Sequence, residues 1–394
     1  MIGIFAFDGP MYCDCNGTYC NTTITNEMFS RYFTVVSKLY VLIRTIHLND
    51  TYINLNLKKV EVDDKLEIVE LPNLNSPLLF LSRHKFIYLI DKYVLKADLI
   101  FLRVPSIISN MTASVCTKHK KPYFAEIGGC AWDSYFNHGI LGKMVAPLMF
   151  LAEKKIVREA TFASYVTERW LQKRYPCSCK SIVASNVYLN NFDESNIERR
   201  IERYSANNIS IYKLGTIASV EVRYKGQEYV IRALGKLKKK GIIINYELVG
   251  TGNPTFLSNI AQQCDVSKQV KFLGVKLHDD IWDWLDSIDI YIQPSKQEGL
   301  PRALIEAMNR GCLTAGSNIA GIPELLEADS IFRSGNVDDI CDVISVLIDE
   351  KNHEKRIRRN FEHSKKFRLT GLESRRNDAF NEYKNYCIDY DGKR

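Results

Sequence analysis

The feature that most constrains the fold of this chain is a regular alternation of short apolar runs with longer stretches of helical periodicity. The runs are rich in Val, Ile, Tyr and Phe, which is typical of buried strands. Strands that alternate with helices predict parallel, doubly wound sheets. The predicted strands are Gly3–Phe7, Lys38–Ile43, Leu99–Arg103, Pro122–Glu126, Phe162–Val166, Ile209–Leu214, Ile242–Val249, Gln269–Phe272, Asp289–Gln293 and Leu313–Ala315.

The alternation falls into two blocks, separated by a polar stretch at residues 190–208. The chain has 394 residues, and at about 100–200 residues per domain two domains are expected. We predict an α/β protein with an N-terminal domain over 1–195, a C-terminal domain over 196–370 and a tail over 371–394. Ligands of such sheets bind beyond the carboxyl ends of the strands. Functional residues should therefore lie in loops that directly follow strands.

The sequence argues against a membrane-spanning or disulfide-stabilised protein. The longest nearly apolar run, Ile140–Ala152, is interrupted by Lys143 and is shorter than the roughly 20 residues that a span needs. The N-terminus lacks the basic region of a signal peptide, and the 11 cysteines are an odd number, which favours reduced thiols in the cytoplasm. Cys13, Cys15 and Cys20 cluster without C-x-x-C spacing or a neighbouring His, so we predict no metal site.

Positive charge is concentrated in two parts of the chain. The formal net charge is +7, and residues 101–180 alone carry +7 while residues 351–394 carry +6. This suits an anionic partner such as a diphosphate or a lipid surface, although solvated helix faces would give the same count. The segment Gly139–Arg158 mixes large apolar residues with Lys and Arg, which suits a helix on an anionic membrane or one packed on the core. We find no nucleic-acid-binding module, so nucleic acid is not an expected partner.

The strongest local signal lies at residues 295–311, directly after a predicted strand. Pro301 suits the first turn of a helix and Gly311 its end, so Glu298 lies in the loop before the helix and Glu306 inside it. Loop N–H groups and the positive helix end can bind an anion, and a carboxylate can accept hydrogen bonds from sugar hydroxyls. These properties suit a nucleotide sugar. The alternative is that both Glu residues merely cap or solvate a helix.

Three further motifs accompany this run: a V-G-x-G loop at 248–252, a turn of F-x-G type at 272–274 and a G-x-P-E loop at 321–324. Together with 295–311, whose Glu residues match an E-x7-E signature, they resemble the retaining GT-B glycosyltransferases of family 4 (group 1). The resemblance implies two Rossmann-like domains that face a central cleft. The N-terminal domain would bind the acceptor, the C-terminal domain the donor, and the tail would cross back to the N-terminal domain.

The resemblance also assigns roles around the donor. Glu306 would bind the ribose hydroxyls, and Glu298 would act beside the donor sugar and diphosphate as a catalytic residue. The backbone of Gly299 and Leu300 would approach the phosphates, and Gly250 would line the same site.

The cations expected at the diphosphate precede the first helix of the C-terminal domain. Lys225 matches the Lys-Gly pair of the family. Thr216, which is also expected to line the donor site, stands where the family usually has Arg. Arg223 is the candidate replacement for that missing charge. Two cations would neutralise charge that develops on the leaving group, and the resemblance implies that no metal or other cofactor is required. The alternative is that Lys225 and Arg223 are solvated loop charges.

Candidates for the acceptor site lie in loops of the N-terminal domain. Gly17 belongs to the long polar loop after the first strand, and Arg103 ends a strand, where it could bind an anionic acceptor. Trp132 could stack on a sugar ring, and Asp133 could accept a hydrogen bond from a hydroxyl. His138 is either a catalytic base or a packed or surface histidine.

The sequence therefore predicts an enzyme that moves a sugar from a nucleotide-diphosphate sugar, with a UDP-sugar favoured, to a glycan hydroxyl with retention. By resemblance, the acceptor would be a lipid-linked oligosaccharide in surface polysaccharide synthesis, such as capsule or lipopolysaccharide. The enzyme would be cytoplasmic and peripheral on the inner face of the cytoplasmic membrane. Two alternatives stay open: a GT-B sugar-nucleotide epimerase, and a non-catalytic subunit that binds glycan or membrane.

Overall fold

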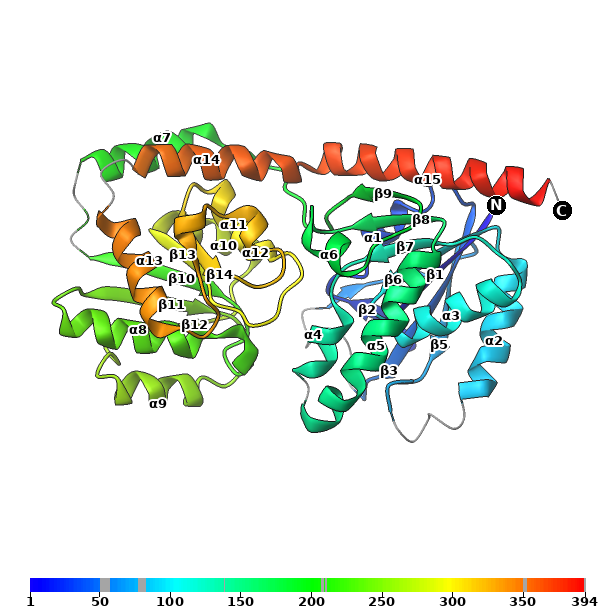
Figure 1. The fold of residues 1–394 in the computed structure, drawn as a ribbon, viewed down its shortest axis with the longest axis horizontal. Coiled ribbons are helices and arrows are strands. Elements are labelled where there is room, and N and C mark those ends of the chain that lie inside the picture. The colour runs from blue at the N-terminus through cyan, green and yellow to red at the C-terminus, as the bar shows by residue number, and fades with distance from the viewer. Residues whose placement is uncertain are drawn as a thin grey trace. The chain divides into compact units, whose positions relative to one another are not determined.

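The computed structural model describes residues 1–49, 57–76, 83–137, 139–206, 209, 211–349 and 353–392. The chain divides into two compact units (Figure 1). The first unit is Met1–Ala184 with Leu372–Arg394, and the second is Ser185–Gly371. The division after Ala184 lies ahead of the 195/196 boundary expected from the sequence, because the polar stretch used to place that boundary includes a helix of the second unit.

The first unit contains nine strands and seven helices among its described residues. The strands are β1 (Ile2–Cys13), β2 (Tyr19–Asn21), β3 (Lys38–His47), β4 (Lys58–Lys59), β5 (Leu66–Leu71), β6 (Leu99–Val104), β7 (Phe124–Ile127), β8 (Phe162–Tyr165) and β9 (Lys180–Val183). The helices are α1 (Asn26–Ser30), α2 (Arg83–Lys96), α3 (Ile107–Lys118), α4 (Ala131–Phe136), α5 (Gly139–Glu159), α6 (Trp170–Arg174) and most of α15 (Leu369–Asp391).

Seven strands of the first unit form a parallel sheet in the order β5-β3-β1-β6-β7-β8-β9. The end of β1 also pairs with β2 in an antiparallel hairpin, and β4 pairs with β2. One face of the sheet packs on helix α15, where Phe380 and Tyr383 are fully buried among rings that include Phe101 and Phe124. The Tyr383 hydroxyl accepts a hydrogen bond from the Ile100 N–H at 3.0 Å. The last helix is therefore part of the core of the first unit.

The second unit contains the remaining elements. Its strands are β10 (Tyr212–Ile217), β11 (Ile244–Val249), β12 (Val270–Gly274), β13 (Ile290–Gln293), β14 (Leu313–Ser317) and β15 (Ile331–Phe332). Its α-helices are α7 (Glu194–Ser205), α8 (Gln227–Lys239), α9 (Thr255–Gln263), α10 (His278–Ser287), α11 (Arg302–Asn309), α12 (Ile322–Leu325), α13 (Val337–Asp349) and α14 (His353–Ser364). Three 3-10 turns complete it: η3 (Arg223–Lys225), η4 (Ala328–Ser330) and η5 (Lys365–Phe367).

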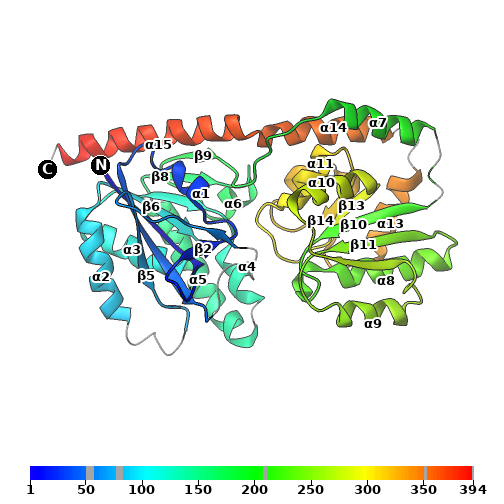
Figure 2. The same ribbon diagram turned by 180° about the vertical axis from the view of Figure 1, so that it is seen from behind.

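The sheet of the second unit is parallel throughout, in the order β12-β11-β10-β13-β14-β15. Helices cover both of its faces (Figures 1 and 2). Side chains of β13 alternate between them: Ile290 and Ile292 belong to one apolar cluster and Tyr291 to the other, as expected for a strand buried on both sides. The strand order reverses between β10 and β13, which is the topological switch point where such sheets bind ligands.

The α/β class with two parallel-sheet domains is confirmed. Every predicted strand overlaps an observed one, whereas β2, β4, β5, β9 and β15 were not predicted. The helix expected from Pro301 begins instead at Arg302, with Pro301 as the extended N-cap residue at ψ 116°. In the described part of the chain, no helix has both the length and the apolarity that crossing a membrane requires.

Candidate functional site

Two loops meet at the switch point of the second unit. Strands β10 and β13 are hydrogen-bonded neighbours, with Leu214 opposite Ile290 and Gly215 opposite Tyr291. Because the strands are parallel, the segments that follow them, 218–226 and 294–301, emerge at the same edge of the sheet. Lys225 lies in the first segment and Glu298 in the second.

Gly226 allows these two segments to touch. Its φ is +76°, and a Cβ atom there would lie 2.0 Å from the Pro294 carbonyl oxygen. Only glycine fits such a left-handed residue in so close an approach. Beside it, the Lys296 N–H donates to the Tyr224 carbonyl at 2.7 Å, so the turn of η3 is joined to the loop after β13.

This contact brings Lys225 to Glu298, although 73 positions separate them in the sequence. The Lys225 Nζ donates to Glu298 Oε1 at 2.7 Å, with the two side chains 24% and 12% exposed. Ser295 Oγ donates to the same oxygen at 2.7 Å and Gln293 Nε2 at 3.1 Å. Three donors on one oxygen fix the orientation of the carboxylate, and within the described residues the other oxygen, Oε2, has no hydrogen-bond partner.

Tyr291 extends this hydrogen-bond network into the sheet. Its hydroxyl accepts a hydrogen bond from the Ile217 N–H at 3.2 Å and donates to Gln293 Oε1 at 3.0 Å. Burial raises the pKa of Tyr291 well above its usual value, and the negative charges of Glu306 and Glu298 act in the same direction. Tyr291 therefore stays neutral, and it lies within electrostatic reach of both Glu residues.

Helix α11 carries Glu306 in a half-buried position, from which its charge acts on Tyr291. The helix forms because Leu304, Ile305 and Met308 supply a buried apolar side. It ends in a Schellman motif around Gly311, which has φ +67°. The Gly311 N–H bonds to the Met308 carbonyl and the Cys312 N–H to the Ala307 carbonyl, both at 3.0 Å.

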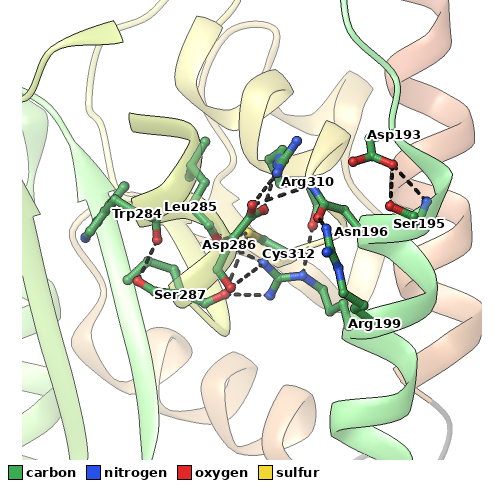
Figure 3. A network of polar contacts seen from close by, with 12 residues as sticks. Asp193, Ser195, Asn196, Arg199, Trp284, Leu285, Asp286, Ser287, Arg310 and Cys312 are labelled. Atoms are coloured by element: carbon green, nitrogen blue, oxygen red, sulfur yellow. Dashed lines mark hydrogen bonds and ion pairs between the residues drawn. The ribbon is translucent and has the colours of Figure 1, made fainter. Parts of the chain in front are cut away.

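A buried arginine of α7 caps the C-terminal ends of helices α10 and α11. Arg200 donates to the Leu285, Asp286 and Ile288 carbonyls at the end of α10 and to the Arg310 carbonyl at the end of α11, over 2.6–3.3 Å. A cation at helix C-termini is favoured by the helix dipole. Figure 3 shows that Arg310 and Asp286 also face each other in this network. The network joins the far end of α11 to α7 and α10.

The other residues predicted at the donor are distributed around this centre. Arg223 is exposed, and its guanidinium lies 4.2 Å from the ring centroid of Phe256 in α9. Leu300 is half-buried against the apolar cluster that includes Leu304, Ile305 and Met308 of α11. The Gly299 carbonyl accepts a hydrogen bond from the Gly321 N–H at 3.0 Å. Gly250 is half-buried in the turn after β11.

Thr216 differs from the expectation. Its side chain is fully buried, and its hydroxyl donates to the Ile292 carbonyl at 2.7 Å and lies 2.8 Å from the Tyr246 hydroxyl. The side chain joins neighbouring strands within the sheet, so it has no free polar atom to offer a ligand.

In the first unit, Trp132 and Asp133 lie together in α4. The Trp132 ring stacks on Phe136 at 5.5 Å and meets Phe150 edge-on at 6.4 Å. Burial raises the pKa of the Asp133 carboxyl, which nearby Arg174 partly offsets. Trp132 is thus held by packing, and both side chains are half-buried.

Two further candidates are placed differently, and one is outside the described residues. Arg103 is nearly buried and pairs with Glu126 at 2.8 Å, across the paired ends of β6 and β7. Its guanidinium is thus engaged by a carboxylate of the same unit, as the Lys225 ammonium is by Glu298, and its place in the acceptor site stays a prediction. Gly17 is exposed at the tip of the β1–β2 hairpin with φ +77°. His138 lies outside the described residues.

A buried carboxyl beside α4 was not predicted from the sequence. Glu153 of α5 is 1% exposed, and its Oε2 accepts from the Ala131 N–H at 2.7 Å. Its Oε1 has no partner among the described residues. Burial raises its pKa from 4.5 to about 8. Glu153 was not predicted to be buried because acidic residues are rarely fully buried, even where they fall among the apolar positions of a helix such as α5.

The arrangement at the switch point suits an anionic ligand with hydroxyl groups. Lys225 provides a cation, the loop before α11 provides backbone N–H groups, and Glu298 and Glu306 provide acceptors. Cations and oriented N–H groups stabilise phosphate oxygens, and carboxylates accept hydrogen bonds from sugar hydroxyls.

Several known proteins are similar to this chain. Residues 212–364 match the family model for glycosyl transferases group 1. Protein CapJ of Staphylococcus aureus is 29% identical over 98% of this chain and 97% of its own length. The capsular polysaccharide biosynthesis glycosyltransferase CapH of the same species is 28% identical over 42% of this chain and 46% of its own. The structure of Anabaena HepE in complex with UDP-glucose has a TM-score of 0.62 at 15% identity, over 97% and 100% of the two chains.

Proposed function

We propose that this protein is a glycosyltransferase that transfers a sugar from a UDP-sugar to a glycan hydroxyl with retention of configuration. The match of residues 212–364 to the glycosyl transferases group 1 model and the likeness of its fold to that of HepE support this proposal. The observation that carries this proposal is the contact of Lys225 with Glu298 at 2.7 Å at the switch point. Glu306 lies on the adjacent helix.

In the proposed complex, the diphosphate of the donor lies against the loop before α11 and against Lys225. As the bond to the sugar breaks, negative charge grows on the leaving phosphate, and the Lys225 ammonium stabilises it. Glu298 orients the sugar through Oε2, and Glu306 accepts hydrogen bonds from the ribose. The leaving phosphate takes the proton of the acceptor hydroxyl, so the reaction needs neither a metal ion nor a separate side-chain base.

The donor and acceptor classes rest on similarity. HepE is a protein of like fold with UDP-glucose bound, which supports a UDP-sugar donor. CapH is named for capsular polysaccharide biosynthesis, which supports a surface polysaccharide as the product. We propose a lipid-linked glycan as the acceptor.

Nucleotide binding is tested first by thermal shift with a panel of nucleotides. UDP at a hundred times its dissociation constant should stabilise the protein by about 2.7 kcal/mol, and other nucleotides should stabilise it less. Stabilisation by a purine nucleotide alone would contradict the assignment of the donor.

Transfer is tested with Lys225→Met and a matched control, Lys240→Met, at the exposed end of α8. The first variant should lose about 10²–10³ in kcat, since it removes a cation from the developing charge, and the control should keep full activity. Product analysis with UDP-sugar alone should give no epimerised nucleotide sugar. Epimerisation without an acceptor, or full transfer by Lys225→Met, would overturn the proposal.

We further propose that the first unit docks on an anionic membrane through α5. Five apolar side chains of this helix are 60–80% exposed, namely Ile140, Leu141, Met144, Leu148 and Leu151. The same helix carries exposed Lys143, Lys154 and Lys155. Apolar side chains beside cations are what an interfacial helix requires, and a lipid-linked acceptor would lie at the same surface.

Vesicle flotation tests this surface. The wild type should float with vesicles rich in phosphatidylglycerol and not with phosphatidylcholine alone, and the double variant Leu148→Glu/Leu151→Glu should lose flotation. Tyr88→Glu is the control, because Tyr88 is 79% exposed on α2 of the same unit. Equal flotation of the wild type with both vesicles, or a dimer that the double variant dissociates, would contradict membrane docking.

A further inference from the structure

A cluster of three side chains that commonly bind metals lies in the first unit, apart from the donor site. Cys13 Sγ, His47 Nε2 and a carboxylate oxygen of Glu70 all lie within 4.8 Å of one another. These residues come from the carboxyl-terminal parts of β1, β3 and β5, which are neighbouring parallel strands. In the register of β1 and β3, Cys13 is directly opposite His47. The fold therefore supplies the histidine and the carboxylate that the sequence near Cys13 lacks.

The chemistry of these three groups suits Zn²⁺. Thiolate, imidazole and carboxylate are its usual ligands, and sites with three protein ligands keep a fourth position for water. A thiolate and a carboxylate together balance the charge of the ion. Cys13 is 5% exposed, whereas the side chains of His47 and Glu70 are 66% and 37% exposed. The site thus combines one buried sulfur ligand with two ligands that are exposed to solvent, from which an ion can bind.

A fourth residue orients the carboxylate. The Tyr19 hydroxyl donates to Glu70 Oε1 at 2.7 Å, while Glu70 Oε2 lies 3.0 Å from His47 Nε2. Tyr19 is directly opposite Cys13 in the β1–β2 hairpin, so both side chains lie on one face of that hairpin. A hydrogen bond that holds one carboxylate oxygen and leaves the other toward the ligand atoms is typical of the surroundings of metal sites.

We propose that Cys13, His47 and Glu70 bind one Zn²⁺ ion, with Tyr19 as a positioning residue. The ion joins the β1–β2 hairpin to the ends of β3 and β5. The site belongs to the first unit, whereas the residues proposed to bind the donor belong to the second. It departs from the expectation that the cysteines near residue 13 bind no metal.

Cobalt is the probe for this site, because thiolate ligation to Co²⁺ gives a charge-transfer band in the near ultraviolet. The full chain, freed of any affinity tag and stripped with a chelator, should take up one equivalent of Co²⁺ with that band, and Zn²⁺ should displace it. Cys13→Ser should abolish the band. Cys179→Ser, which alters an exposed cysteine elsewhere in the unit, should keep it.

Two exposed variants make the test independent of folding. His47→Ala and Glu70→Gln alter side chains that are not part of the core, so both proteins should fold. Each substitution should weaken Zn²⁺ affinity at least about tenfold. Zn²⁺ should raise the melting temperature of the wild type more than that of either variant. Absence of the band from the wild type, its retention in Cys13→Ser, or equal Zn²⁺ affinity in all proteins would overturn the proposal.

Discussion

At the scale of single residues, the buried carboxyl of Glu153 has the most direct consequence for stability. Its pKa in the folded protein is about 8, against an ordinary 4.5. Between these values the unfolded chain releases the proton and the folded chain keeps it. The difference in pKa therefore stabilises the folded protein. Its contribution to the free energy of unfolding is complete below pH 4.5 and falls by about 1.4 kcal/mol per pH unit as the pH rises towards 8.

Glu153→Gln should remove this pH dependence, since the amide stays neutral and can still accept from the Ala131 N–H. The variant should be more stable than the wild type at pH 8 and should differ less from it at pH 5, as measured by urea unfolding. Glu159→Gln, in the same helix but exposed, should follow the wild type at both pH values. Parallel pH profiles for wild type and Glu153→Gln would contradict this account.

The sequence places some of the predicted site residues correctly in the fold, while their roles stay predictions. Glu298 and Lys225 sit in loops after strands, and the structure brings them into contact. Gln293 and Tyr291 were not predicted as site residues. Their positions follow from the alternation of side chains between the two faces of β13, whose sequence is that of an ordinary buried strand. The pairing of Arg103 with Glu126 depends on the register of two strands, which the sequence does not reveal.

At the scale of elements, the turn of η3 depends on Gly226. Gly226→Ala should cost more stability than Gly241→Ala. Both glycines have positive φ, but a Cβ at 241 would meet nothing within 4 Å, whereas one at 226 would strike Pro294. The left-handed conformation alone costs about 1–2 kcal/mol, and this is the expected loss at 241.

The two glycine variants should also differ in activity. Displacing the turn moves Lys225 away from Glu298, and a misplacement of about 1 Å can cost about 10²-fold in rate. Transfer assays should therefore show a large loss for Gly226→Ala and none for Gly241→Ala. Equal activity of the two variants would show that the approach to Pro294 does not position Lys225.

Element prediction worked best for long apolar runs and least well for short polar strands. Strands β10 to β14 were anticipated because each is a compact apolar run between helices. Strands β2 and β4 are short and join a hairpin, and β9 begins with Lys180 and Ser181. Their pairing is determined by neighbours in the sheet, so their own residues carry little signal.

At the scale of the whole molecule, the first unit is completed by the last part of the chain. Phe380→Ala should destabilise this unit by about 3–5 kcal/mol, because it leaves a cavity among fully buried rings. Ile388→Ala, on the same helix but 51% exposed, should change stability by about 0.5 kcal/mol or less. Limited proteolysis with mass spectrometry should locate the first new cleavages of Phe380→Ala within residues 1–184, and cleavage confined to residues 185–371 would contradict this view.

The place of α15 in that core sets an order for folding during synthesis. Domains usually fold in the order in which the ribosome makes them, but here the first unit lacks Phe380 and Tyr383 until the whole of the second unit has been synthesised. The second unit has all of its residues by Gly371. It can therefore finish folding first, while residues 1–184 of the nascent chain still have an apolar sheet face that only α15 covers.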